Sequence, residues 1–219
     1  HISNEYNGEC FCGLCLKSWH DWLKKKYKTL DNLNECWWTY FWSHNYTAWA
    51  QVDPRDKCVD GLKVDWARFI TWQCCDFMRH EIAPLKKITP KSPVTTNMMG
   101  FYDLMDYWKI GEICDFIADD TYPTWYNTED NTHTAILMSA THDMHRSMKG
   151  GKPFLIMESC PSATNWQPFH RLKRPGVHKR EMLLAIAHGA DGTMYFQYRK
   201  GKGACEKFHG AVIDHVGHE

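Results

Sequence analysis

Two glutamates stand in sequence contexts where their carboxyl groups could act on one substrate. Glu5 lies in the segment Asn4-Glu5-Tyr6, and Glu158 ends the apolar run at residues 153–157. Cleavage of a glycosidic bond needs one carboxylic acid to protonate the leaving oxygen and a second carboxylate to attack the sugar or activate water. Asn4, beside the first glutamate, could hydrogen-bond a sugar hydroxyl. On spacing alone, both glutamates could equally be ordinary solvated or salt-bridged residues.

Three cysteines are clustered a few residues further along the chain. Cys10, Cys12 and Cys15 lie within six residues, and a tight turn can direct three thiolates at one tetrahedral Zn²⁺. A closed structural zinc site needs four ligands, so three cysteines are a moderate signal. The alternative is three reduced thiols.

The elements that must position these groups alternate along the chain. Helical spacing of apolar residues predicts helices at residues 14–27, 33–49, 64–82, 103–110, 132–148 and 175–188. The third of these should end before Pro84. Short apolar runs bounded by turns predict strands at residues 92–97, 113–118, 153–157 and 193–198, and residues 2–5 could end a fifth.

This alternation predicts an α/β fold in which helices cover a parallel sheet. The expected strands end near polar side chains, namely Asn97, Asp119 with Asp120, Glu158, and Gln197 with Arg199. Polar residues at strand carboxyl ends are typical of the active face of a (β/α)8 barrel, although a doubly wound sheet collects them too. No glycine-rich phosphate loop follows any expected strand, which argues against nucleotide binding.

The composition narrows the possible partners. The chain has 219 residues, 43% of them hydrophobic, and its 26 Lys and Arg balance 26 Asp and Glu. A neutral chain without a basic stripe gives no reason to expect a nucleic-acid partner. No apolar run approaches the ~20 residues of a membrane-spanning helix. Ten cysteines in a chain that is neither short nor loop-rich favour a reducing, cytoplasmic compartment over a disulfide framework.

Several motifs in register resemble glycoside hydrolase family 42, the β-galactosidases. The matching stretches are HISNEY at 1–6, LNECWWTYFW at 33–42, NWQP at 165–168, KRPG at 173–176, HGAD at 188–191 and EKFHG at 206–210. The resemblance implies a retaining exo-β-galactosidase with Glu5 as acid/base and Glu158 as nucleophile. It implies sugar contacts from Asn4, Asp120, Tyr122, Trp166, Glu206 and His209. Without it, Trp166 would be interpreted as core packing and His209 as a structural histidine.

The resemblance also carries expectations about the parent enzyme. Residues 1–219 would form the C-terminal part of a TIM-barrel catalytic domain, roughly strands four to eight, without strands one to three and the downstream domains. Zn²⁺ on Cys10, Cys12 and Cys15 would be structural, with a fourth ligand upstream, and the parent would be a homo-oligomer, a trimer by resemblance. Two alternatives remain: a sister activity on α-L-arabinopyranosides or β-D-fucosides, or a catalytically inactive fragment. Carboxyl groups about 5–5.5 Å apart would indicate a retaining site.

Overall fold

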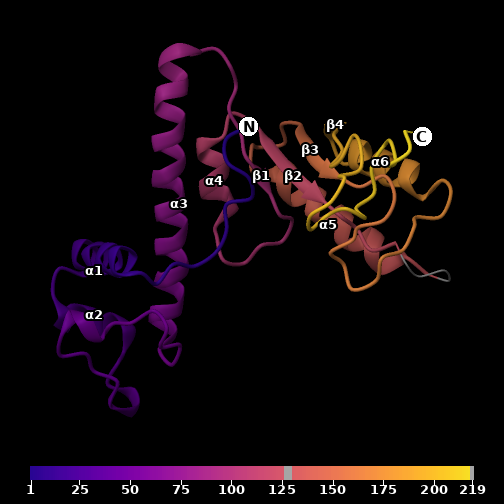
Figure 1. The fold of residues 1–219 in the computed structure, drawn as a ribbon. Helices are drawn as coiled ribbons and strands as arrows, with labels where there is room; N and C mark the ends of the chain where they lie inside the picture. Colours follow the sequence, from indigo (N-terminus) through magenta and orange to yellow (C-terminus); the bar gives the residue numbers. More distant parts are fainter. Residues whose placement is uncertain (126–129, 218–219) are drawn as a thin grey trace. The chain divides into compact units, whose positions relative to one another are not determined.

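The computed structural model describes residues 1–125 and 130–217 and divides the chain into two compact units (Figure 1). The first unit contains His1–Tyr6, Glu81–Tyr102 and the described residues from Gly111 onward. The second contains Asn7–His80 and Asp103–Ile110. None of the described helices is both long enough and apolar enough to cross a membrane.

A parallel sheet forms the centre of the first unit. Its described strands are β1 (Asn97–Met98), β2 (Ile117–Thr121), β3 (Phe154–Ser159) and β4 (Ala190–Thr193), in that spatial order. Apolar residues that are buried on these strands, such as Ile117, Phe154 and Ile156, account for the pairing. The β2–β3 register places Asp120 opposite Glu158. Two carboxyl groups therefore end neighbouring strands at the same level.

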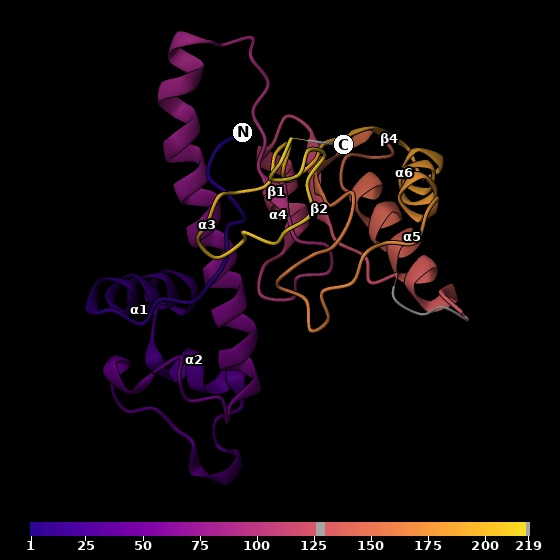
Figure 2. The same cartoon turned by 45° about the vertical axis from the view of Figure 1, so that its right-hand side comes forward.

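Helices connect successive parallel strands, as such strands require. The connections are α4 (Tyr107–Ile113), α5 (Thr132–Ser147) and α6 (Val177–Ala187). Helix α5 contacts β2, α6 contacts β4, and the two helices contact each other, so they cover the same face of the sheet (Figure 2). Gly176 precedes α6 with φ +81°, a conformation that favours glycine. The predicted α/β alternation is confirmed.

The second unit packs helices around aromatic side chains. It contains α1 (Gly13–Tyr27), α2 (Leu30–Trp37), two 3-10 turns at Phe41–Ser43 and Trp49–Gln51, and the first part of α3 (Asp60–Ile88). Trp19 is fully buried and its ring contacts the rings of Trp66 and Phe69. Thr29 caps α2 by accepting a hydrogen bond from the Asn32 backbone N–H at 3.2 Å.

Several predicted boundaries are wrong. Helix α3 continues through Pro84 to Ile88 rather than ending before it, and the helix predicted at residues 33–49 ends at Trp37. Trp38 adopts a left-handed conformation with φ +54°, and its N–H caps the Glu35 carbonyl at 3.1 Å.

Three strand predictions and one helix prediction also need correction. The strands predicted at residues 92–97, 113–118 and 193–198 correspond to β1, β2 and β4, whose bounds differ from the predicted ones. The helix predicted at residues 103–110 corresponds to α4, which begins and ends later. Residues 2–5 form no strand. They lie beside the segment that leads into β1, where the Ile2 N–H donates to the Thr95 carbonyl at 3.0 Å.

Candidate active site

Three carboxyl groups converge at the carboxyl ends of the strands. Glu5 comes from the opening segment, Asp120 from β2 and Glu158 from β3. One carboxylate oxygen of each lies within 4.8 Å of those of the other two. The sequence separation of Glu5 and Glu158 gives no hint of this proximity, which the sheet and the opening segment create together.

A buried asparagine at the end of β1 connects this cluster. The Asn97 amide nitrogen lies 2.6 Å from Asp120 Oδ2, 2.9 Å from Asn4 Oδ1 and 3.2 Å from Glu158 Oε1. Its oxygen accepts the Glu5 backbone N–H at 2.8 Å. The sequence placed Asn97 at a strand end but did not identify it as a site residue. Its place at the end of a predicted strand was the available signal.

Tyr122 holds the other oxygen of Glu158. Its hydroxyl donates to Glu158 Oε2 at 2.7 Å. Burial raises the pKa of Glu158, the charges of Glu5 and Glu206 add to this, and the hydrogen bonds from Tyr122 and Asn97 oppose it. The pKa of Tyr122 is strongly raised by burial and by its bond to Glu158, so the phenol stays protonated and remains a donor.

Asp120 has a different environment, although it lies in the same cluster. Burial, followed by the charge of Glu158 and a hydrogen bond with Glu5, raises the pKa of Asp120 to about 10. Three carboxylates this close cannot all be ionised at neutral pH without a large repulsive cost. Asp120 is therefore the member that keeps its proton, which leaves Glu158 free to ionise.

A cavity of about 310 Å³ opens onto the two glutamates. Among the predicted residues, those that line it are Asn4, Glu5, Tyr122, Glu158, Trp166 and Glu206, and Phe196 joins them. Trp166 is 56% exposed, and its ring meets that of Tyr122 edge-on with centroids 5.2 Å apart. An exposed tryptophan on a polar cavity favours a sugar platform over the core packing that residue type alone suggested.

Glu206 and His209 reach the site through a close approach of two loops. The Gly210 N–H donates to the Ala163 carbonyl at 2.7 Å, and a Cβ on Gly210 would lie 2.7 Å from Cys160 Sγ. Only glycine permits that contact. His209 is fully buried, and its Nδ1 lies 3.2 Å from Asn165 Oδ1 and 3.8 Å from Glu206 Oε2.

Asp120 and His209 lie behind the cavity wall rather than on it, because neither is among the residues that line the cavity. Burial lowers the pKa of His209, so its ring is neutral at neutral pH. His209 Nε2 is buried and has no hydrogen-bond partner among the described residues. Sugar contacts from these two residues therefore stay a prediction.

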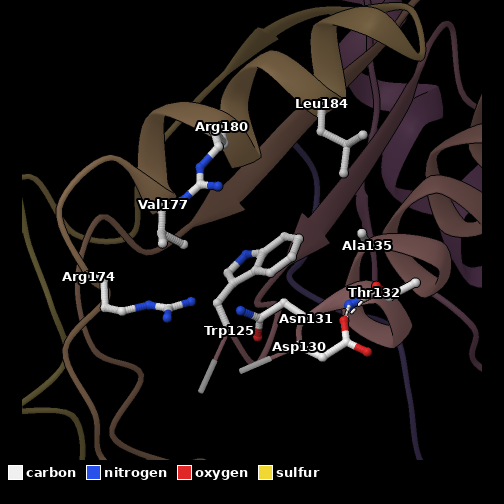
Figure 3. Close-up of a pocket in the computed structure, with 9 residues that line it drawn as sticks. All are labelled: Trp125, Asp130, Asn131, Thr132, Ala135, Arg174, Val177, Arg180 and Leu184. Carbon is white, nitrogen blue, oxygen red and sulfur yellow. Dashed lines mark hydrogen bonds between the residues drawn. The ribbon is translucent and has the colours of Figure 1, made fainter. Parts of the chain in front are cut away.

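A larger cavity of about 480 Å³ lies between α5 and α6 (Figure 3). Arg174, Arg180 and Trp125 all line it. Asp130 is the one carboxylate among its described lining residues, and it accepts the Thr132 backbone N–H at 2.8 Å. The described residues that line this cavity include no pair of carboxyl groups, so they do not offer the chemistry of the smaller cavity.

The cysteine cluster belongs to the second unit. The sulfur atoms of Cys10, Cys12 and Cys15 lie within 4.8 Å of one another, which fits three ligands of one metal ion. A hydrogen bond from the Cys15 backbone lowers the pKa of Cys12 to about 7, whereas burial and the neighbouring thiols raise that of Cys15 to about 11. The donors are soft and convergent, and one thiol is close to its thiolate form.

The whole sequence, residues 1–219, matches the glycoside hydrolase family 42 model, whose description is beta-galactosidase. The chain belongs to this family. Similar curated relatives include the beta-galactosidase BglY of Alicyclobacillus acidocaldarius, 53% identical over 100% of the chain and 32% of the relative. Beta-galactosidase Pbg of Clostridium perfringens is 45% identical over 100% of the chain and 33% of the relative.

Solved structures of family 42 enzymes match as well. The cold-adapted beta-galactosidase of Rahnella sp. R3 superposes with a TM-score of 0.96 at 52% identity, covering 100% of this chain and 33% of that one. A catalytic mutant of the G. stearothermophilus beta-galactosidase Gan42B, a glutamate-to-alanine change, superposes at 0.92 with 45% identity, covering 99% and 33%. These neighbours confirm the predicted partial (β/α)8 barrel. The chain spans about a third of the length of these relatives.

Proposed function

We propose that this chain carries the two catalytic carboxyl groups of a retaining exo-β-galactosidase. The observation that supports this most directly is the approach of Glu5 and Glu158, whose oxygens come within 4.8 Å. Inverting enzymes keep their carboxyl groups about 6.5–9.5 Å apart to admit a water molecule, whereas retaining enzymes hold them about 5–5.5 Å apart. The close pair favours direct attack on the sugar.

The roles follow from the surroundings of each group. Glu158 accepts hydrogen bonds on both oxygens, from Tyr122 and from Asn97, which orients a carboxylate for attack at the anomeric carbon. Glu5 would donate its proton to the leaving oxygen as the bond to the anomeric carbon breaks. It would then take a proton from the water that releases the sugar from Glu158. Asp120, kept neutral by burial, would not compete as nucleophile.

The cavity supplies contacts for a single terminal sugar. Trp166 offers an aromatic face to the C–H groups of the ring, while Asn4 and Glu206 offer polar atoms to its hydroxyls. Tyr122 and the more deeply placed Asp120 and His209 complete the proposed set. The names of the relatives favour β-D-galactosides as the substrates.

We also propose that Cys10, Cys12 and Cys15 hold a structural Zn²⁺. The three convergent sulfurs and the lowered pKa of Cys12 support it, and a fourth ligand would complete the tetrahedron. Zinc would stabilise the residues after Tyr6 and take no part in the chemistry.

The wider setting of the chain is part of the proposal. The chain would be the part of a larger catalytic barrel from about strand four to strand eight, in an enzyme that assembles as a homo-oligomer, a trimer by resemblance. None of the ten cysteines, all of which are described, forms a disulfide, which favours a reducing, cytoplasmic compartment.

The deciding experiment replaces the nucleophile. Glu158→Gln in the longer enzyme that carries this chain should abolish turnover of nitrophenyl β-D-galactoside, because an amide cannot form the glycosyl ester. Native-like turnover by that variant would contradict the assignment. A wild-type enzyme that prefers nitrophenyl α-L-arabinopyranoside or β-D-fucoside would shift the substrate to a sister sugar. Absence of turnover by the wild-type sequence on all three substrates would favour the alternative of a catalytically inactive fragment.

A further inference from the structure

We propose that Asn97 is the positioning residue that keeps Glu158 ionised and ties it to the backbone of Glu5. The inference rests on the proposed function, because it assigns a task within the same site. Asn97 is 3% exposed and is not among the residues that line the cavity. It contacts instead the residues that do.

The orientation of the Asn97 amide is fixed by its partners. A backbone N–H can only donate, so the Glu5 N–H, 2.8 Å away, must face the amide oxygen. The amide nitrogen then points at Asn4, Asp120 and Glu158. The ring nitrogen Nε2 of His1, 2.9 Å from the same oxygen, is placed to donate as well. Rotation of the amide by 180° would set oxygen against two carboxyl groups.

Two amide hydrogens face three acceptors. The shortest of these contacts, 2.6 Å, goes to Asp120, and the longest, 3.2 Å, goes to Glu158. Burial keeps Asp120 protonated, and a protonated carboxyl is a weaker hydrogen-bond acceptor than a carboxylate. The Asn97 amide can therefore donate preferentially to the ionised Glu158. The strongest acceptor of the three is an ionised carboxylate.

The charge around Glu158 explains why this donor matters. Glu5 from the opening segment, Asp120 from β2 and Glu206 from the C-terminal loop are the carboxyl groups that face it, and all three oppose its ionisation when charged. Tyr122, after β2, faces it with a protonated hydroxyl. Among the described residues that bond its side chain, only Tyr122 and Asn97 stabilise its charge.

Covalent labelling by dinitrophenyl 2-deoxy-2-fluoro-β-D-galactoside isolates this effect. In that reaction the Glu158 carboxylate bonds to the anomeric carbon while dinitrophenolate leaves with the bonding electron pair. The leaving group needs no proton, so the pH dependence of labelling reports the ionisation of Glu158 and not of Glu5. The experiment compares three versions of the longer enzyme that carries this chain: wild type, Asn97→Ala and Asn97→Asp.

Asn97→Asp replaces the amide donor with a further carboxyl oxygen while keeping an acceptor for the Glu5 N–H. Its labelling should be roughly tenfold slower than wild type at pH 5–6 and should approach wild type at alkaline pH. Asn97→Ala removes the donor without adding charge. The acidic side of its pH–labelling profile, called here the acid limb, should therefore shift in the same direction as in Asn97→Asp, but by less.

Asn34 provides the matched control. It is also a buried asparagine, which donates to the Tyr46 carbonyl at 2.8 Å and accepts the Tyr46 N–H at 3.0 Å, but it belongs to the second unit. Asn34→Asp should lower the melting temperature and leave the acid limb unchanged. An unmoved acid limb in Asn97→Asp would overturn the inference, even if that variant were slow at every pH. A wild-type enzyme that is never labelled would remove the proposed function and this inference with it.

Discussion

Tyr122 donates its phenolic hydroxyl to Glu158 Oε2 at 2.7 Å, while Asn97 lies 3.2 Å from Oε1 of the same carboxyl. Asn97 belongs to β1 and Tyr122 directly follows β2, and the two donors hold the plane of the carboxylate between them. A carboxylate held on both oxygens has lost its freedom to rotate before a substrate arrives. The geometry at Glu158 is therefore set by β1 and β2 as much as by its own strand.

Glu5 should matter most when the leaving group is poor. In the longer enzyme, Glu5→Ala should slow lactose cleavage by about 10²–10⁴, because the leaving sugar needs a proton, and should slow dinitrophenyl galactoside far less. Azide should restore part of the turnover by attacking the sugar on Glu158. Glu35→Ala, an exposed glutamate on α2, is the control and should change neither rate. Equal losses on both substrates without azide rescue would remove Glu5 from the role.

The cysteine cluster should bind one metal ion per chain. Metal analysis should find about one zinc, and cobalt substitution should give the charge-transfer absorption of thiolate ligands. Serine at Cys10, Cys12 and Cys15 should lower the melting temperature and leave the pH dependence of hydrolysis unchanged. Cys58→Ser, at an exposed cysteine outside the cluster, should change neither property. A pH profile that shifts on metal removal would place the metal in the chemistry.

The buried pair Lys173–Glu181 should carry a large share of local stability. The lysine nitrogen lies 2.6 Å from Glu181 Oε2, and their side chains are 9% and 2% exposed. Lys173→Met leaves the buried Glu181 carboxylate with only the Trp125 indole N–H, 3.2 Å away, as a donor among the described residues, so the free energy of unfolding should fall by about 3 kcal/mol.

Urea unfolding measures that loss, and the more exposed pair Lys86–Asp115 provides the control. Lys86→Met should cost at most about 1 kcal/mol, because a pair open to water gains little. Similar losses in the two variants would show that burial does not set the strength of the Lys173–Glu181 pair.

The buried Asp120 should make stability fall as pH rises. The folded state keeps its proton up to about pH 10, whereas an unfolded aspartate loses it near about pH 4. Between those values the folded state binds more protons, so raising the pH favours unfolding. Asp120→Asn removes this dependence and should raise the melting temperature, more at pH 9 than at pH 5.

Asp115→Asn is the opposite case and serves as its control. Hydrogen bonds from Lys86 and from the Val94 N–H lower the pKa of Asp115, so its charge stabilises the fold above the pKa of the unfolded residue. That variant should lose stability at pH 9. A melting temperature of Asp120→Asn that follows wild type at every pH would show that Asp120 is ionised.

Local patterns predicted much of the fold but little of its long-range polar contacts. The helices α1, α5 and α6 were predicted to within two residues because their apolar spacing and flanking turns agree. The helix predicted at residues 33–49 failed because Asn34 binds the backbone of Tyr46 at both its N–H and its carbonyl, which requires a turn between them. Nothing local reveals that bond.

The candidate site also contains residues that local motifs identify and a residue that they do not. Glu5 and Glu158 could be named from their motifs, but Asn97 could not, because its partners lie 23 to 96 residues away along the chain. Its strand is only two residues long, so the periodicity that identifies strands had little to act on. The continuation of α3 through Pro84 was also missed, since proline disfavours a helix interior without forbidding it.

Hydrogen bonds, more than apolar packing, attach the opening segment to the rest of the sheet unit. Ile2 is its one buried apolar residue, and the Ser3 hydroxyl donates to Glu81 at 2.7 Å, while Tyr6 also bonds Glu81. Such a segment can open by local unfolding at a much smaller cost than global unfolding. Glu5, the proposed acid/base, would then leave the site while Glu158, the proposed nucleophile, stays in place. Warming should therefore change substrate selectivity before it melts the enzyme, with activated galactosides outlasting natural ones.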